Sequence, residues 1–314
     1  MFSNKDLERY SRQIILKKVG ILGQKKIQNS KVLVVGCGGL GTPVIDLLCR
    51  AGIGEIGMMD HDKVSISNLH RQVMFNSDDV GKYKVNILKK KISKINKKVK
   101  VKIYRNKAAE KNLGKILKEY DVIVDGTDNF KAKFLLNKFS LKYKKKLIIG
   151  AISKFEGHIF TFDFNLKKSP CLKCFYQGEP AEGVLDCETD GILGSTAVIT
   201  GSLQANEVLK TILNVGKNLN SHILIIDLLN LKFRKVLFSQ SIKIKANGQH
   251  TFQSKTILKH FNICLWVVFG IQRNVKNPLF LEGFRGTERI RTAVQAFAEL
   301  CLATRPQCQR IAKV

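Results

Sequence analysis

The segment VLVVGCGGLG, residues 32–41, constrains the fold of this 314-residue chain more than any other stretch. Its apolar start is typical of a buried strand, and glycines at positions 36, 38, 39 and 41 lead into an apolar-periodic segment, residues 42–51. Glycine lacks a Cβ, so it permits a tight turn and the close approach of a polyphosphate, and backbone N–H groups at the helix start attract negative charge. The segment therefore predicts a strand, a nucleotide-binding turn and a helix.

The residues that follow bear on which nucleotide binds. Asp60 ends the next predicted strand, 19 residues after Gly41, where a carboxylate can accept hydrogen bonds from ribose hydroxyls. Proteins that bind NAD, FAD or ATP share the glycine pattern, and some matches are turns without a ligand. Arg71 in a polar loop and Lys84 beyond it favour a triphosphate, whose β and γ phosphates need cations around them. The alternative is that Arg71 and Lys84 lie on a solvated face.

A second strand is predicted over residues 120–125, and it ends in the sequence DGTDN. Because the carboxyl ends of parallel strands meet at one edge of a sheet, we expect Asp125 and Asp128 to face the same site as the glycine turn. Asp128 would be placed to hold Mg²⁺ there.

Alternating strand and helix patterns indicate an α/β fold with a doubly wound, Rossmann-like, mostly parallel sheet. From Gly157 onward the strands come closer together and flank a helix predicted over residues 195–213, which indicates an extension of the sheet by antiparallel strands. Residues 175–192 have weak periodicity and are expected to form a mobile crossover loop. The expected strands cover residues 31–36, 55–60, 99–104, 120–125, 146–151, 159–164, 223–227 and 233–238.

Six motifs, taken together, resemble those of the ThiF/MoeB/HesA adenylyltransferases of molybdopterin-synthase and thiamine biosynthesis, which are relatives of the ubiquitin-activating enzymes. The resemblance covers roughly residues 5–240. In chain order the motifs are RYSRQI (9–14), GCGGLGTP (36–43), SNLHRQ (67–72), DGTDN (125–129), CLKCFY (171–176) and GSLQANEVLK (201–210).

The resemblance implies an enzyme that uses ATP and Mg²⁺ to adenylylate a small ubiquitin-like sulfur-carrier protein at its C-terminal Gly-Gly, with release of pyrophosphate. It also implies a homodimer, because Arg12 resembles an arginine that crosses into the partner's ATP site; taken alone, Arg12 would be a surface residue of an amphipathic helix. Gly39 and Asp60 would contact adenosine and ribose. The residues implied to bind the phosphates and metal are Ser67, Asn68, Leu69, His70, Arg71, Lys84, Asp128 and Asn129.

The eight cysteines are expected to be reduced thiols, since no signal peptide is recognisable. Cys171 and Cys174 form a CxxC pair, which is half of a tetrahedral zinc site. The family completes the site with a second CxxC, but here the corresponding segment reads SQSIKIKANGQH, and neither His250 nor Cys264 has the pair spacing. Two thiolates seldom hold Zn²⁺ tightly, so zinc is doubtful and the pair can equally be a relic.

Three further cysteines lie in apolar surroundings and are expected to belong to the core: Cys37, Cys49 and Cys264. Cys187 falls where some relatives carry a cysteine that attacks the adenylate or links to the carrier. Its neighbours Asp186 and Glu188 would raise rather than lower a thiol pKa, so its catalytic role rests on position alone.

The formal net charge of +29 is the most unusual bulk property of the chain. Lysines are scattered without aromatic residues between them or a recognisable binding module, which argues against nucleic acid as a partner, and no apolar run is long enough to cross a membrane. We interpret the lysine excess as the codon bias of an A+T-rich genome and expect a plastid stroma or a bacterial cytoplasm. A cationic surface would also steer ATP and an acidic carrier.

The resemblance ends near residue 245, so we expect an adenylation domain over 1–245 and a discordant extension over 246–314. Residues 281–314 contain five arginines and one lysine, whereas the preceding chain contains seven and forty-one. We interpret this end of the chain, residues 281–314, as a frameshift or readthrough artefact; the alternative is a remnant of a rhodanese domain after Gln249, although no persulfide loop is visible.

Two other functions are considered. A degenerate nucleotide-binding scaffold would account for the missing zinc pair, but Arg12, Arg71, Lys84 and Asp128 are all present. An NAD-dependent reductase is disfavoured, because no catalytic Tyr/Lys or His arrangement accompanies the glycines. The sequence leaves open whether the carrier serves molybdopterin, thiamine or tRNA thiolation.

Overall fold

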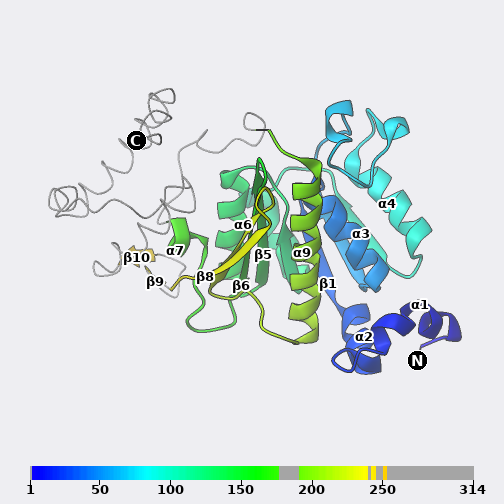
Figure 1. Ribbon diagram of the computed structural model, residues 1–314, viewed down its shortest axis with the longest axis horizontal. Coiled ribbons are helices and arrows are strands. Elements are labelled where there is room, and N and C mark those ends of the chain that lie inside the picture. The colour runs from blue at the N-terminus through cyan, green and yellow to red at the C-terminus, as the bar shows by residue number, and fades with distance from the viewer. Residues whose placement is uncertain (1, 177–190, 240–241, 245–249, 253–314) are drawn as a thin grey trace. The chain divides into compact units, whose positions relative to one another are not determined.

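An eight-stranded sheet organises the chain, of which the computed structural model describes residues 2–176, 191–239, 242–244 and 250–252 (Figure 1). The strand order is β3-β2-β1-β4-β5-β6-β7-β8; β3 through β5 are parallel, and β6, β7 and β8 are added antiparallel. This confirms the predicted doubly wound sheet with its antiparallel extension. The strands are β1 Lys31–Val35, β2 Glu55–Met59, β3 Lys100–Tyr104, β4 Val122–Asp125, β5 Lys146–Ser153, β6 Glu156–Asp163, β7 His222–Asp227 and β8 Lys232–Leu237. A separate pair joins β9 Ile242–Ile244 to β10 His250–Phe252.

The predicted strands are all present, with small differences at their ends. β4 begins at Val122, two residues later than expected. β5 and β6 are longer than expected, because only Lys154 and Phe155 separate them and Lys154 adopts a left-handed backbone, φ 53°, that closes a tight hairpin. The apolar runs of β1 and β2 are buried almost throughout, as is typical of strands covered on both faces.

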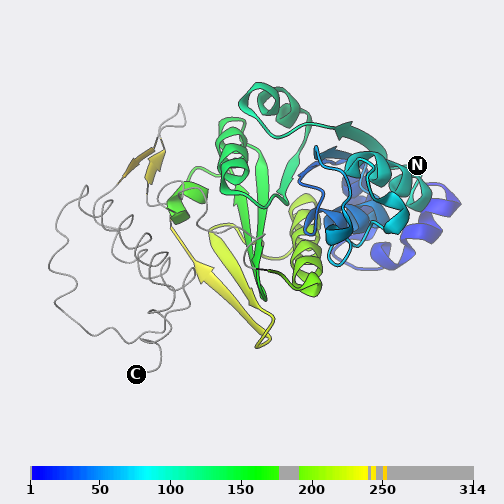
Figure 2. The same cartoon turned by 90° about the horizontal axis from the view of Figure 1, so that it is seen from above.

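Helices cover both faces of the sheet, as Figure 2 shows from above. α3, α4 and α9 lie on one face, with α3 and α9 packed side by side, and α5 and α6 lie on the other. The helices are α1 Asn4–Ile14, α2 Gly20–Asn29, α3 Gly41–Ala51, α4 Lys84–Ile95, α5 Glu110–Ile116, α6 Phe130–Lys142, α7 Leu172–Tyr176 and α9 Gly194–Leu213. Short 3-10 turns occur at η1 Ile66–Asn68, η2 Ser77–Asp79 and η3 Leu117–Glu119.

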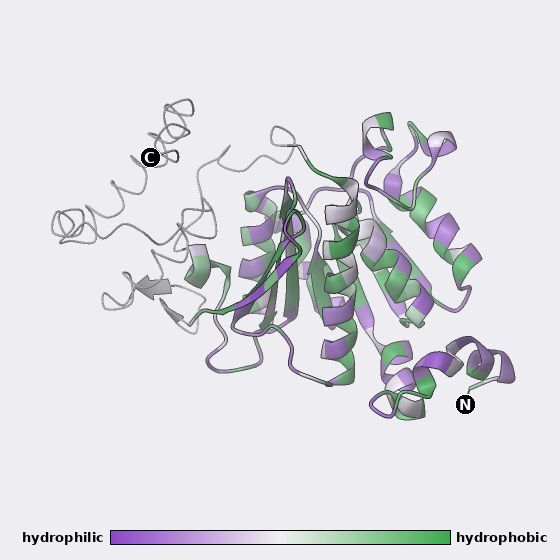
Figure 3. Cartoon of the chain, viewed as in Figure 1, coloured by the Kyte–Doolittle hydropathy of each residue, from purple (hydrophilic) through white to green (hydrophobic). Residues whose placement is uncertain are grey.

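The main core lies between the sheet and α3, α4 and α9, where Val34, Leu48 and Val208 are fully buried. Figure 3 shows the contrast between this hydrophobic centre and the mainly hydrophilic helix α1. Close approach of α9 to α3 depends on Gly201, since a Cβ there would lie 2.5 Å from the carbonyl oxygen of Leu40. Over the described residues, no helix is both long and apolar enough to cross a membrane.

An aromatic cluster covers β6 on the opposite face from α9. Phe160 and Phe175 meet edge to face with their centroids 5.0 Å apart, and Phe238 joins them at 6.1 and 5.5 Å from the two rings. Such edge-to-face pairs add to the free energy of burial. The cluster holds the one-and-a-half turns of α7, which the sequence analysis did not predict and which include Phe175 and Tyr176 from the expected crossover loop. Residues 177–190 of that loop lie outside the described residues.

Candidate functional site

The glycine turn after β1 packs directly on the turn after β4, at the point where the strand order reverses. Gly36 has a left-handed backbone, φ 84°, and a Cβ there would lie 2.7 Å from the carbonyl carbon and oxygen of Gly126. A Cβ on Gly41 would lie 2.0 Å from the carbonyl oxygen of Gly36, so the turn itself admits no side chain. In open α/β sheets ligands bind outside the carboxyl ends of the strands at this switch point. The two motifs predicted to share a site are therefore brought together.

Asp60 follows β2 and is buried against the glycine turn. Its carboxylate accepts one hydrogen bond from the backbone N–H of Cys37 at 2.8 Å and another from the backbone N–H of Asp62 at 2.8 Å. Each carboxylate oxygen keeps a second lone pair, so these bonds orient Asp60 without using up its capacity to accept. The position of Asp60 at the end of the second strand was predicted from the sequence, but its hydrogen bond to the glycine turn was not.

Lys84 is buried, so its placement on a solvated face is wrong. It is the first residue of α4, and its ammonium donates to the carboxylate of Asp62 at 2.9 Å, while its backbone N–H donates to the Asp62 carbonyl. Burial raises the pKa of Asp62, but the hydrogen bond and charge of Lys84 outweigh it, and the pKa lies below its ordinary value. Lys84 is thus a positive charge held beside the glycine turn by an acidic partner.

The SNLHRQ segment forms η1 and the turn after it. Arg71 donates to the carbonyl oxygen of Ser67 at 3.0 Å and lies 2.6 Å from Nε2 of His70, so its guanidinium is held over its own loop. Asn68 accepts from the backbone N–H of Ser65 at 3.3 Å, and Leu69 packs partly against the core. These contacts fix the loop as a unit.

Arg71 also lies next to the glycine turn, because a Cβ on Gly39 would be 3.5 Å from Arg71 Cγ. The same Cβ would be 3.1 Å from Cβ of Ala197 in the first turn of α9. The start of α9 packs on the backbone of the loop as well, since a Cβ on Gly194 would meet the carbonyl oxygen of His70 at 2.2 Å. The predicted residues Gly39, His70 and Arg71 therefore converge around the amino end of α9.

Two features of the site were missed by sequence reasoning. Gln72 is almost fully buried with its amide beside Gly38, although only its place in the motif drew attention to it. Tyr83, which precedes Lys84, is flanked by the ammonium of Lys63 at 5.3 Å and the guanidinium of Arg105 at 5.4 Å from its ring centroid. An aromatic residue directly before a basic helix start was the available signal for the second feature.

The two aspartates of the DGTDN turn differ in exposure: one is buried in the interior and the other lies at the surface. Asp128 is exposed, and its carboxylate accepts from the side-chain amide of Asn129 at 3.2 Å. Asn129 caps α6 by accepting from the backbone N–H of Ala132 at 2.9 Å. Asp125, in contrast, is fully buried and paired with Lys133, so the expectation that it faces the site is wrong. Its carboxylate accepts hydrogen bonds inside the protein and is not available to a ligand.

The residues at this edge fit a nucleotide triphosphate. The glycines of the turn carry no side chain that could stand between the backbone and a phosphate, α3 begins at Gly41 without a side-chain cap, and Arg71 and Lys84 lie alongside. The exposed carboxylate of Asp128 suits Mg²⁺, which prefers oxygen and keeps several waters, while the amide of Asn129 donates to that carboxylate and its oxygen caps α6.

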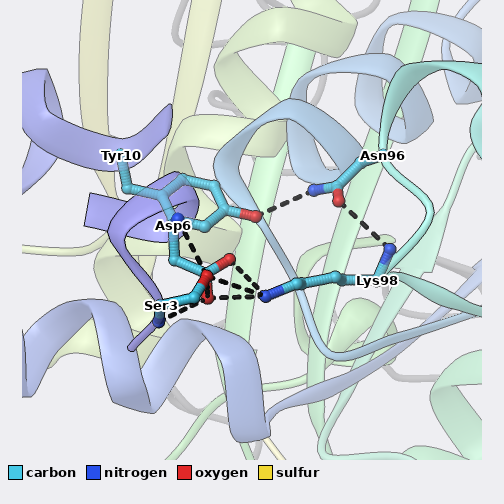
Figure 4. Close-up of polar contacts among 5 residues, drawn as sticks. All are labelled: Ser3, Asp6, Tyr10, Asn96 and Lys98. Carbon is cyan, nitrogen blue, oxygen red and sulfur yellow. Dashed lines mark hydrogen bonds and ion pairs between the residues drawn. The ribbon is translucent and has the colours of Figure 1, made fainter. Parts of the chain in front are cut away.

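Arg12 is exposed on α1 and lies away from this site in its own chain. α1 is fastened at Tyr10, whose hydroxyl accepts from Asn96 at 2.9 Å (Figure 4) and whose ring packs against Gly52. Gly52 ends α3 and Asn96 ends α4, while the glycine turn and Lys84 stand at the opposite ends of those helices. An eleven-residue helix such as α3 is about 16 Å long. No hydrogen bond or ion pair holds the Arg12 guanidinium within the described part of the chain.

The zinc-type pair is only half a site in the described residues. The sulfur atoms of Cys171 and Cys174 lie 3.7 Å apart, both buried, and the hydrogen bond between them and burial raise the pKa of Cys171. The one group of three candidate ligands found there is elsewhere, at Asp60, His61 and Asp62. The predicted core positions of Cys37 and Cys49 are confirmed. Cys187 and Cys264 lie outside the described residues, as does the His250 side chain.

Comparisons with known proteins find a family model and several similar proteins. The ThiF family matches residues 10–244. A sulfur carrier protein adenylyltransferase from Thermus thermophilus is 35% identical over 82% of this chain and 96% of its own length. A probable molybdopterin-synthase adenylyltransferase from Gracilaria tenuistipitata is 37% identical over 74% of this chain, which spans 65% of that relative. A crystal structure of E. coli MccB with ATP, 26% identical, superposes with a TM-score of 0.65 over 74% of this chain and 72% of MccB.

Proposed function

The chain belongs to the ThiF family, and we propose that it is the adenylyltransferase of a small ubiquitin-like sulfur-carrier protein that ends in Gly-Gly. ATP is the second substrate, and pyrophosphate is released. The observation that carries the proposal is the meeting of the glycine turn, Arg71, Lys84 and the Asp128 turn at one edge of the sheet. The name of the Thermus relative, which this chain matches over almost its whole length, supports the substrate class.

In this reaction a carboxylate oxygen of the carrier's terminal glycine attacks the α phosphorus of ATP. A new phosphorus–oxygen bond forms, and the bond from the α phosphorus to the bridging oxygen of pyrophosphate breaks. Because the attacking carboxylate is already an anion, the chain needs no strong general base, and its task is positioning and charge neutralisation. Arg71 and Lys84 serve the phosphates, together with Ser67, Asn68, Leu69 and His70 from the same loop. Asp128 and Asn129 would hold Mg²⁺, which offsets phosphate charge when bound.

Gly39 and Asp60 serve the nucleoside. The bonds that Asp60 accepts from Cys37 and Asp62 set its carboxylate beside the glycine turn, and its remaining lone pairs can accept from ribose hydroxyls. Gly39 would meet the adenosine with its backbone, and its missing side chain lets Arg71 and Ala197 of α9 approach the turn closely.

The enzyme works as a homodimer in which Arg12 completes the partner's site. The location of α1 supports this, since Tyr10 is anchored at the ends of α3 and α4 farthest from the glycine turn of the same chain. An exposed arginine without an intramolecular partner in the described residues is available to a second chain. Around it, exposed apolar side chains gather on α1 and α2 and the turn between them: Leu7, Ile15, Leu16, Ile21 and Leu22.

Cys187 stays a candidate for a covalent step with the carrier on the basis of its position in the sequence. A zinc ion at Cys171 and Cys174 needs two more ligands, and the described residues do not provide them.

The family relationship and the names of the relatives weigh against a degenerate scaffold or an NAD-dependent reductase. We place the enzyme in a plastid stroma or a bacterial cytoplasm, with neither nucleic acid nor membrane as a partner, and the algal relative favours molybdopterin among the candidate pathways.

Exchange of labelled pyrophosphate into ATP tests the proposal. The protein should support exchange only when a carrier ending in Gly-Gly is present. Asp128→Ala should abolish exchange and leave the melting temperature unchanged, because Asp128 is exposed. Asp78→Ala, which removes an equally exposed carboxylate on η2, is the matched control and should retain full exchange. Undiminished exchange in Asp128→Ala would remove Asp128 from the site.

A further inference from the structure

Lys133 occupies a place that is unfavourable for a lysine on two counts. It is the fourth residue of α6, where the positive end of the helix dipole repels a cation, and it is 6% exposed. Burial of an ammonium group is costly unless the charge is paired and every donor is used. A lysine at such a position needs compensation from its surroundings.

The surroundings supply three oxygen atoms, one for each N–H of the ammonium group. Lys133 donates to the carboxylate of Asp125 at 3.1 Å, to the carbonyl oxygen of Thr127 at 2.7 Å and to the carbonyl oxygen of Gly150 at 2.7 Å. These acceptors belong to the end of β4, the DGTDN turn and β5. The Thr127 carbonyl is part of the peptide bond that leads to Asp128, so Lys133 holds the turn directly behind the exposed carboxylate.

Asp125 is fixed from other sides as well. Its second carboxylate oxygen accepts from the backbone N–H of Thr127 at 2.9 Å and from the Thr127 hydroxyl at 2.6 Å, which closes the turn. The side-chain amide of Gln204 in α9 donates to the Asp125 carbonyl oxygen at 2.9 Å. With Asp125 neutralised and turned inward, Asp128 is the aspartate that the turn presents at the surface.

We propose that Lys133 is the positioning residue of the Asp128 turn: its ammonium group cancels the charge of Asp125 and locks the peptide between Thr127 and Asp128 in the orientation that receives a metal–ATP complex. The proposal rests on the proposed function for the role of Asp128. It assigns to the buried face of α6 a part in nucleotide binding.

The test measures binding of Mn²⁺ in the presence of ATP, by the loss of the free Mn²⁺ signal in electron paramagnetic resonance. The double variant Asp125→Asn/Lys133→Met removes both charges and so leaves no unpaired ion inside the protein. It should raise the Mn²⁺ concentration for half-saturation by about 10-fold or more, which is typical of the loss of an outer-shell partner. The exchange rate at saturating Mn²⁺ should fall less than the apparent affinity. Lys138→Met, which removes an exposed lysine of the same helix paired with Glu110, should change neither.

Lys133→Arg provides a second measurement if the double variant does not fold. It keeps a cation beside Asp125, but a planar guanidinium cannot direct its donors at three oxygens that surround an ammonium group. Half-saturation should again rise, and the melting temperature should fall, because a buried carbonyl oxygen loses its hydrogen bond. Mn²⁺ binding equal to the original protein in a folded variant would overturn the role of Lys133. Failure of the proposed function would instead appear as Mn²⁺–ATP binding without carrier-dependent exchange in the unmodified protein.

Discussion

The hydroxyl of Tyr10 accepts a hydrogen bond from the side-chain amide of Asn96, 2.9 Å away in space and 86 residues away in sequence (Figure 4). The same amide donates to the carbonyl oxygen of Cys49 at 3.1 Å, and the Tyr10 ring lies against Gly52. One buried tyrosine thus joins α1 to the last turns of α3 and α4. Substitutions around Tyr10 can therefore measure how much the attachment of α1 contributes to stability.

Gly52→Ala should detach α1 at this point. A Cβ there would lie 2.5 Å from the Tyr10 ring, and the backbone φ of 84° adds strain for any L side chain, so we expect a loss of about 3 kcal/mol in the free energy of unfolding. Gly81→Ala is the matched control, since Gly81 has a similar φ of 81° with no atom within 4 Å of the added Cβ, and it should cost about 1 kcal/mol. Urea titration measures the free energy of unfolding of both variants. Equal losses would show that the Tyr10 ring moves to accommodate the new methyl group.

Asp6 should make stability depend on acid pH. Hydrogen bonds from Lys98 and Ser3 lower the pKa of Asp6 from 3.8 to about 2. Since the folded pKa lies below the unfolded one, the stabilisation is complete above about pH 4 and is lost as the pH falls through 2. The difference in urea midpoint between the original protein and Asp6→Asn should therefore shrink over this range. Lys98→Met should move the loss to higher pH; an unchanged profile would mean that Lys98 does not set the pKa of Asp6.

Lys84→Met should reduce exchange by about 10²–10³-fold, because a buried cation beside the phosphates acts on charge that develops in the transition state. The loss should appear at saturating ATP as well as at low ATP. Lys82→Met is the control, since Lys82 is exposed and donates only to the carbonyl oxygen of Asp78. Full exchange in Lys84→Met would show that this lysine has only a structural role, as the partner of Asp62.

Mixing two inactive variants tests the shared site. If Arg12 completes the site of a partner chain, Arg12→Ala and Asp128→Ala proteins should each lack exchange and regain about a quarter of it when mixed in equal amounts, because half of the dimers are heterodimers and each of these contains one intact site of two. Subunit exchange is followed independently with fluorescent labels. Confirmed exchange of subunits without recovery of activity would place Arg12 outside the catalytic site.

Removal of the chain beyond Pro278 should change neither the melting temperature nor the rate of exchange. The expectation rests on the reversal of lysine and arginine usage and on the absence of any family motif in this region. A fall of more than about 4 °C would correspond to roughly 1–2 kcal/mol for a domain of this size. Such a fall would show that the extension packs on the core and is a genuine part of the fold.

The sheet could be predicted from sequence because each parallel strand is a short apolar run, and the glycine turn fixes where the first βα unit reverses direction. The role of Lys133 could not be predicted in the same way, because it depends on Gly150 and Gln204, which are distant in sequence. A local signal was present in α6, where Lys133, Asn137 and Ser140 recur at helical spacing and are all buried. Polar residues on the inner face of a helix indicate fixed partners inside the protein.

The same limit applies to the split between Asp125 and Asp128. Three positions separate them in a turn, and nothing in the sequence DGTDN states which carboxylate turns inward. The distinction follows from the Asp125 side chain being the last of a buried strand, so that it meets Lys133 and Thr127 rather than solvent. In α1, likewise, the motif RYSRQI contains both the buried Tyr10 and the exposed Arg12. Their packing, and not the sequence, shows which side chain anchors the helix and which is available to a partner chain.

The central position of β1 has a consequence for how the protein is made. Val32 pairs with Ile56 on one side and with Val122 on the other, about 90 residues further along the chain. The glycine turn rests on Gly126, so a nascent chain cannot assemble its nucleotide site until that residue has left the ribosome. At ordinary elongation rates this interval lasts roughly 5–20 s, during which β1 has an unpaired edge. Chaperone dependence should therefore be concentrated in the first half of synthesis, whereas the β5–β6 and β7–β8 hairpins can each form as soon as the second strand emerges.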